Sequence, residues 1–392
     1  MYAYKRNPYV DSRGLLIAIN PTDFYDQLAI HGVEFFAGVP DSLLKEFCLC
    51  IDDRVSSDRH IIAANEGNAV ALASGYYLAT QSLPLVYMQN SGLGNAVNPL
   101  LSLCDPEVYS IPLLVMIGWR GEPGIKDEPQ HLKQGKVQLG LLESMGLPYE
   151  IISKDDDQFA MKIIRAVEKA KNKNTPSILL IKKGTFDTYN SEIHDFDDKR
   201  MMREEALEVI LNNLDDNAII VSTTGKTSRE IFEIREKKSQ SHSRDFLTVG
   251  SMGHCSSIAL GIALAKPKRD VVCIDGDGAM LMHLGSLTSI ASLQPKKFRH
   301  ILMNNEVHES VGGQKTAAKN IDLSSIVEAM GSSKMFKAKT PAELKENITD
   351  FMTCVGPSFL EVKIRPGSRE DLGRPTIKPV NNKVNFMGFL EK

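Results

Sequence analysis

The chain has 392 residues, which is enough for two or three domains whose cores need no disulfide or metal to fold. Hydrophobic residues make up 42% and charged residues 24%, which excludes a disordered chain, and 28 glycines in no triplet pattern exclude a collagen. The net charge of -3 excludes a chain that binds nucleic acid over its whole surface, although a local basic pocket stays open.

The first half of the chain is expected to alternate strands and helices. A helix is predicted to begin at Pro21, with Asn20 as its N-cap, and to end at Gly32 after His31. Short apolar runs are predicted as strands at residues 33–37, 60–64, 84–89, 111–117 and 177–181. Because these runs are apolar on both faces and separated by helical patterns, we expect a parallel sheet covered on both sides.

The second half repeats the alternation, with strands expected at residues 218–222, 271–275, 300–304 and 358–364. The fold class is therefore α/β, with two doubly wound parallel-sheet domains. We expect an N-terminal domain over residues 1–185, a polar linker over 186–205, a C-terminal domain over 206–365 and a tail over 366–392.

The sequence favours a cytoplasmic protein. The N-terminus lacks the apolar core of a signal peptide, and the longest apolar stretch, residues 111–119, is shorter than the ~20 residues of a membrane span. The six cysteines are scattered and form no CxxC pair, which is typical of a cytosolic protein whose thiols stay reduced.

The strongest local motif is Gly276-Asp277-Gly278, between an apolar run and a helical pattern. Glycines let the backbone approach a ligand, and the first amides of a helix suit a phosphate. Asp277 suits a Mg²⁺ ion bridging to that phosphate. Asn304-Asn305 follows after 25 further residues, at the end of the next predicted strand, so Asn305 can supply a second ligand. The alternative is a pair of unrelated strand-to-helix turns, and the spacing favours the shared site.

This pairing resembles the signature of thiamin-diphosphate enzymes. The resemblance implies that Asp277, Asn305 and the carbonyl of Val307 hold Mg²⁺ on the cofactor. The turn that would receive the diphosphate consists of Gly276, Gly278 and Ala279.

Glu66, in Ala63-Ala-Asn-Glu-Gly, matches the acid that this family places against N1′ of the aminopyrimidine. Burial beside a neutral ring should raise its pKa, because desolvation disfavours the anion. From the residues alone, a glutamate stabilised by the dipole at a helix start is the alternative.

Two further segments resemble cofactor loops of the same family. Met252 matches the apolar residue beneath the cofactor, and the carbonyl of Gly250 would receive the 4′-amine. Thr224 and Gly225 follow the strand at 218–222 as a second loop. A P-loop is excluded because Ile220 stands where its first glycine belongs.

The length leaves no room for the central domain of the three-domain relatives. Among two-domain members, the chain resembles the phosphonopyruvate decarboxylase family over nearly its whole length, with sulfopyruvate decarboxylase as the near alternative. The matching segments are residues 38–42, 65–68, 89–95, 119–121, 127–131, 250–254 and 308–314. An acyl-transferring ligase stays open, whereas a silent assembly partner would be expected to have lost Glu66, Asp277 or Asn305.

The resemblance implies decarboxylation of 3-phosphonopyruvate to phosphonoacetaldehyde, in phosphonate biosynthesis of the 2-aminoethylphosphonate type. Candidate substrate-binding residues, in loops after predicted strands, are Ser42, Arg120, Lys133, Gly312 and Gly313. The residue that protonates the product stays open among Asp41, His131 and His308. The family also implies at least a homodimer, with the cofactor between subunits.

Overall fold

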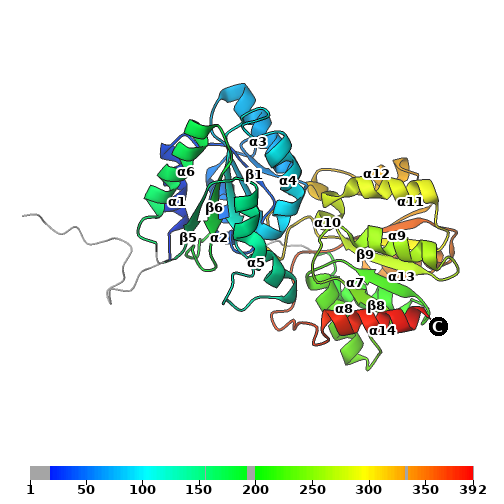
Figure 1. The fold of residues 1–392 in the computed structure, drawn as a ribbon. Coiled ribbons are helices and arrows are strands. Elements are labelled where there is room, and N and C mark those ends of the chain that lie inside the picture. Colours follow the sequence, from blue (N-terminus) through cyan, green and yellow to red (C-terminus); the bar gives the residue numbers. More distant parts are fainter. Residues whose placement is uncertain (1–17, 155, 192–198, 332–333, 392) are drawn as a thin grey trace, which may run out of the picture. The chain divides into compact units, whose positions relative to one another are not determined.

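The computed structural model describes residues 18–154, 156–191, 199–331 and 334–391 (Figure 1). The chain forms two compact units. The N-terminal unit consists of residues 1–194 with Val311–Gln314, and the C-terminal unit consists of Asp195–Ser310 and Lys315–Lys392. Each unit holds one six-stranded parallel sheet among the described residues, which confirms the α/β fold class.

The N-terminal sheet has the order β2-β1-β3-β4-β6-β5. Its strands are β1 Phe36–Gly38, β2 His60–Ile62, β3 Leu85–Gln89, β4 Leu114–Gly118, β5 Tyr149–Ile152 and β6 Ser177–Ile181. Its helices are α1 Pro21–Ile30, α2 Lys45–Arg54, α3 Glu66–Thr80, α4 Leu93–Ser102, α5 Pro129–Ser144 and α6 Phe159–Lys173. Figure 1 shows α1 and α6 on one side of this sheet and α3 and α4 on the other.

Two apolar cores result, one on each face of the N-terminal sheet. Phe24 of α1, Phe47 of α2 and Ile163 of α6 belong to one core. Val70 of α3 and Leu142 of α5 belong to the other. The central strands are buried on both faces, as expected of a doubly wound sheet.

The C-terminal sheet has the order β11-β12-β10-β9-β7-β8. Its strands are β7 Ile219–Ser222, β8 Asp245–Leu247, β9 Val271–Gly276, β10 Phe298–Asn304, β11 Lys334–Ala338 and β12 Ser358–Lys363. Its helices are α7 Arg203–Asn212, α8 Lys226–Lys237, α9 Cys255–Ala265, α10 Asp277–Met282, α11 Leu287–Leu293, α12 Leu323–Ala329, α13 Pro341–Thr353 and α14 Pro379–Leu390. Short 3-10 turns lie at Asn90–Gly92, Leu284–Ser286 and Ala317–Lys319.

The first predicted helix is confirmed at its start: the side chain of Asn20 accepts a hydrogen bond from the Thr22 amide, and Pro21 is the first helical residue. The nine predicted strands are present, within a few residues of their expected bounds. The strands β5, β8 and β11 were not predicted from the sequence. The strand β8 has only three residues, and β11 lies at a sheet edge with partly exposed, charged side chains, so neither has a continuous apolar run.

The C-terminal segment is more ordered than the predicted tail. Residues 379–390 form α14, in which Phe386 is 4% exposed. The side chain of Asn382 donates to the backbone carbonyl of Asp245 at 2.8 Å, which ties α14 to β8. The predicted linker also overlaps a helix, because α7 begins at Arg203. No helix in the described part of the chain is long and apolar enough to span a membrane.

Candidate active site

The glycine-rich turn joins β9 to α10 and places Asp277 at the first position of that helix. Asp277 is 3% exposed, and the hydroxyl of Thr316 donates to its Oδ2 at 2.5 Å. Burial raises the pKa of Asp277 to about 6, although hydrogen bonds from Thr316 and from the backbone amide of Asn305 act in the opposite direction. The two predicted metal ligands, Asp277 and Asn305, are therefore neighbours.

Asn305 lies directly after β10 and begins a loop that turns back on itself. The backbone amide of Val307 donates to Asn305 Oδ1 at 3.2 Å, and Val307 pairs with Lys315 in an antiparallel bridge. The amide of Thr316 then donates to the carbonyl of Glu306 at 2.8 Å. This loop brings Thr316 back to Asp277, so local backbone pairing holds the candidate ligands in place.

Glu309 joins this loop to a buried charge network that the sequence analysis did not identify. The side-chain amide of Asn305 donates to Glu309 Oε2 at 3.0 Å. Arg203 and Lys226 each donate to Glu309 at 2.8 Å. Arg203 also forms two hydrogen bonds with Glu230, at 2.7 and 2.9 Å. Glu309 lies within residues 308–314, one of the segments that resemble the family. Its partner Arg203 is 106 residues away, and no local sequence pattern indicates that contact.

Gly278 lies beneath two of the predicted site residues. A Cβ atom at this position would lie 2.8 Å from Cε1 of His308 and 3.5 Å from Cε of Met252. Both side chains therefore meet over the start of α10. Burial lowers the pKa of His308 to about 4, so its imidazole is neutral near pH 7.

The other predicted cofactor loops end strands of the same sheet. Thr224 and Gly225 follow β7, and Gly225 has a φ of +93°, which favours glycine. Gly250 and Met252 follow β8 and are half-buried. Gly276 ends β9, and Ala279 is buried within α10. These positions lie after the carboxyl ends of parallel strands, where α/β sheets bind ligands.

Glu66 is the first residue of α3 and is 5% exposed. The side chain of Asn95 donates to its Oε2 at 2.7 Å. Burial raises the pKa of Glu66, and the hydrogen bond from Asn95 only partly opposes this, so the expected direction is confirmed. Gly92 lies against the carboxyl group, since a Cβ there would be 2.1 Å from Glu66 Oε1.

A second polar cluster gathers Asp41, Ser42 and Arg120 at the ends of β1 and β4. Gln89 donates to Asp41 Oδ1 at 2.7 Å, and burial raises the pKa of Asp41. Arg120 donates through Nη1 to the hydroxyl of Ser42 at 2.9 Å and through Nε to Asp127 at 2.8 Å. The structure thus brings three of the predicted residues together and adds Gln89 and Asp127.

The remaining residues predicted to bind substrate or to donate a proton differ in their burial and backbone conformation. His131 is buried on α5, whereas Lys133 is exposed on the same helix. Gly312 and Gly313 have φ angles of +146° and +83°. The neighbouring Gln314 is 2% exposed, and neither polar atom of its amide has a hydrogen-bond partner within the described part of the chain.

The C-terminal segment ties Arg369 down by ion pairs. Its guanidinium donates to Glu204 at 2.6 Å, to Asp371 at 2.8 Å and to Glu233. These ion pairs hold the partly exposed Arg369 side chain against α7 and α8.

The donor set around the glycine-rich turn fits a hard divalent cation. Asp277 offers a buried carboxylate, Asn305 an amide oxygen and Val307 a backbone carbonyl, and Mg²⁺ prefers such oxygen ligands together with phosphate oxygens. A Cβ at Gly276 would have one neighbour, 3.9 Å away, which leaves the backbone open to a ligand. The turn therefore suits a metal-bound diphosphate.

Comparisons with known proteins agree with this geometry. Residues 22–140 match the family model "Thiamine pyrophosphate enzyme, N-terminal TPP binding domain", and residues 223–362 match "Thiamine pyrophosphate enzyme, C-terminal TPP binding domain". Thiamine pyrophosphate is another name for thiamin diphosphate.

Three curated relatives extend over most of the chain. The phosphonopyruvate decarboxylase of Streptomyces viridochromogenes is 33% identical over 95% of both chains. That of Streptomyces hygroscopicus is 34% identical over 95% of this chain and 94% of its own. The sulfopyruvate decarboxylase of Methanosarcina acetivorans is 28% identical over 86% of this chain and 89% of its own. The chain belongs to the phosphonopyruvate decarboxylase family of thiamine pyrophosphate enzymes.

Proposed function

We propose that this protein removes CO₂ from 3-phosphonopyruvate and releases phosphonoacetaldehyde, using thiamin diphosphate and Mg²⁺, in phosphonate biosynthesis. The observation that carries this proposal is the similarity to two phosphonopyruvate decarboxylases over 95% of the chain. The sulfopyruvate decarboxylase is less similar and matches less of the chain. Decarboxylation of sulfopyruvate is therefore the second candidate.

In this proposal, Asp277, Asn305 Oδ1 and the carbonyl of Val307 hold Mg²⁺. The backbone of Gly276, Gly278 and Ala279 receives the diphosphate, and the loops with Thr224, Gly225, Gly250 and Met252 hold the rest of the cofactor. When bound, thiamin diphosphate supplies the electron sink that accepts the electron pair left by the departing CO₂.

Glu66 is proposed as the catalytic acid that holds a proton toward the pyrimidine ring. Its burial raises its pKa, so its carboxyl group can keep a proton nearer neutral pH than an exposed glutamate can. The hydrogen bond from Asn95 fixes the position of one carboxyl oxygen. Gly92 leaves the space that the other oxygen occupies.

The anionic substrate requires donors, and Arg120 is the central candidate. Ser42 and Asp127 hold its guanidinium in one orientation. Lys133 and the amides of Gly312 and Gly313 are proposed as further donors, together with the unpaired side-chain amide of Gln314.

Three residues are proposed as sources of the proton that ends on the product. Burial raises the pKa of Asp41, so its carboxyl group can keep a proton at a higher pH than an exposed aspartate can. His308 is neutral near pH 7, and His131 is buried on α5.

Measurement of CO₂ release tests the proposal. Purified protein is assayed with phosphonopyruvate, sulfopyruvate and pyruvate, with and without thiamin diphosphate and Mg²⁺. Cofactor-dependent turnover of phosphonopyruvate above the other two is expected. Preference for sulfopyruvate would favour the second candidate, and a coupled hydroxyketone in the presence of an aldehyde would indicate a ligase. Absence of turnover of all three, despite thiamin diphosphate binding, would overturn the substrate assignment.

The Glu66→Gln variant tests the catalytic assignment. It should bind thiamin diphosphate yet lose roughly 10²–10⁴-fold in turnover, the usual contribution of a general acid or base. Glu107→Gln, at an exposed glutamate, is the matched control and should keep full turnover. Unchanged turnover in Glu66→Gln would refute the assignment.

We further propose a homodimer or larger oligomer, with each cofactor site shared by two subunits. Mixing of inactive Glu66→Gln and Asp277→Asn proteins, after subunit exchange, should then restore activity, because a mixed dimer contains one intact site. Absence of restored activity in verified mixed dimers would contradict a shared site. A cytoplasmic location is proposed as well, since none of the six cysteines, all of which are described, forms a disulfide. Reduced cysteines are typical of a reducing compartment.

A further inference from the structure

A second group of metal-binding side chains lies inside the C-terminal unit. Cys273 and Asp275 lie two residues apart on β9, so their side chains share one face of the sheet. His300 on β10 pairs in register with Cys273. One ligand atom from each of these three buried residues lies within 4.8 Å of those of the other two.

Cys255, the first residue of α9, lies beside this group of three as a candidate fourth ligand. Its thiol donates to the backbone carbonyls of Val221 at 3.3 Å and Ile274 at 3.7 Å, and it must leave both to bind a metal ion. Its Sγ lies 3.4 Å from Sγ of Cys273. Two thiolates on a tetrahedral zinc ion, with Zn–S bonds of about 2.3 Å, lie roughly 3.8 Å apart. The two sulfur atoms are therefore within a few tenths of an ångström of the spacing that a zinc ion requires.

The carboxylate and the imidazole of this group face each other without a hydrogen bond. Asp275 Oδ2 and His300 Nε2 are 3.7 Å apart, which is longer than a hydrogen bond. Both atoms are buried and have no hydrogen-bond partner within the described ranges of the chain. The two atoms lie within ion-pair distance. A metal ion bound between them would give both a partner, which matters because burial of a polar atom without a hydrogen bond or a metal is costly.

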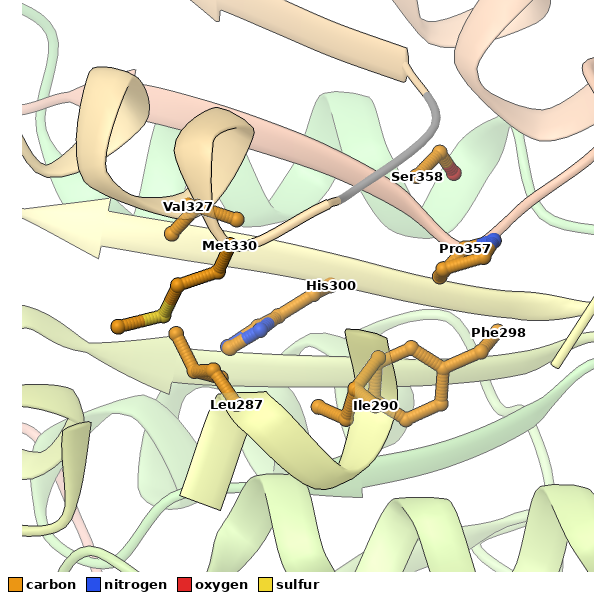
Figure 2. A pocket seen from close by; sticks show the side chains of 8 residues that line it. All are labelled: Leu287, Ile290, Phe298, His300, Val327, Met330, Pro357 and Ser358. Carbon is orange, nitrogen blue, oxygen red and sulfur yellow. The ribbon is translucent and has the colours of Figure 1, made fainter. Parts of the chain in front are cut away.

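The surroundings of His300 leave room for a small adjustment of its ring. Figure 2 shows His300 among the side chains of Leu287, Val327 and Met330, around a cavity of about 10 Å³. The ring also makes an edge contact with Phe359, with centroids 5.2 Å apart. An apolar shell of this kind excludes water from a buried site.

We propose that Cys255, Cys273, Asp275 and His300 form a structural Zn²⁺ site in the C-terminal unit. Thiolate and imidazole ligands favour zinc over magnesium, and four protein ligands make a closed site without an open position for substrate. The site is distinct from the oxygen ligands proposed for Mg²⁺ at Asp277. It would join α9 to the two central strands of the sheet.

Cobalt substitution of the full-length protein tests the proposal. Reduced, metal-free protein is titrated with Co²⁺ in the presence of saturating Mg²⁺ and thiamin diphosphate. One equivalent per chain should produce the near-ultraviolet absorption of a thiolate–cobalt bond, and Zn²⁺ should remove it. An oxygen-only site cannot give this absorption, so the readout separates the proposed site from the Mg²⁺ site.

Variants assign the ligands. Cys273→Ser and His300→Gln should weaken Co²⁺ binding at least tenfold, whereas Cys104→Ser, at a buried cysteine of the N-terminal unit, should leave the titration unchanged. Asp277→Asn should also keep the cobalt signal. If folded, reduced wild-type protein gives no thiolate–cobalt absorption, the proposal is overturned whatever the variants do. A Cys255–Cys273 disulfide that withstands reduction would overturn it too.

Discussion

The side-chain amide of Asn305 donates a hydrogen bond to the carboxylate of Glu309 at 3.0 Å. A carboxylate only accepts hydrogen bonds, so this contact requires the amide nitrogen to face Glu309 and turns Oδ1 the other way. Oδ1 accepts the backbone amide of Val307 and keeps a lone pair for a cation. Glu309 is thus a positioning residue for the proposed Mg²⁺ site.

The Glu309→Gln variant should weaken the apparent Mg²⁺ affinity about 10- to 100-fold, as loss of a residue that orients a metal ligand typically does. The measurement is a Mg²⁺ titration of activity at saturating thiamin diphosphate. Glu204→Gln is the matched control, because Glu204 also pairs with an arginine and a lysine, Arg369 and Lys237, but makes its contacts elsewhere. An unchanged half-saturation in a folded Glu309→Gln protein would contradict the positioning role.

The Gly92→Ala variant tests how closely Glu66 is held. Gly92 has a φ of -76°, so alanine fits the backbone, but its Cβ would lie 2.1 Å from Glu66 Oε1. The carboxyl group must move, and a displacement of about 1 Å at a catalytic group can cost roughly 10²-fold in rate. Gly94→Ala adds the same atom where, apart from the chain neighbours and the backbone of its own helix, no atom lies within 4 Å. Steady-state assays of this variant should show near-normal activity. If Gly92→Ala is as active as Gly94→Ala and the wild type, the activity does not depend on the exact position of the Glu66 carboxyl group.

The buried Glu66 should reduce the stability of the protein at neutral pH. Its folded-state pKa is raised above the ordinary 4.5, chiefly by desolvation, so the folded state favours the protonated form. The stability that this group contributes is full below pH 4.5 and is lost as pH rises through the folded pKa. Glu66→Gln should therefore be at least as stable as the wild type at pH 7.5, with an advantage that shrinks on acidification. Urea unfolding of both proteins across this pH range, with Glu107→Gln for comparison, measures the difference; an advantage that grows on acidification would be inconsistent with a raised pKa.

The sequence predicted those site residues that come directly after a strand, because a strand and the turn that follows it can be recognised from neighbouring residues. Asp277 and Asn305 follow strands that prove to be neighbours, and their contact follows from parallel pairing of β9 with β10. The network of Glu309 with Arg203 was not predictable in this way, because 106 residues separate the partners and nothing in either segment indicates the other. The hydrogen bond from Arg120 to Ser42 was not predictable for the same reason, because 78 residues separate the two partners.

The C-terminal helix α14 lies in a segment whose composition predicted a tail instead of a packed helix. The segment 366–392 is rich in proline, glycine and charge, yet Phe386 of α14 packs into the core and its ring lies 5.4 Å from that of Phe246. Phe386→Ala should lower the free energy of unfolding by about 3–5 kcal/mol, the usual cost of removing a buried phenylalanine. Val384→Ala, at a side chain 57% exposed on the same helix, should change it by less than about 0.5 kcal/mol. Urea unfolding measures both, and equal small effects would mean that α14 adds little to the stability of the unit.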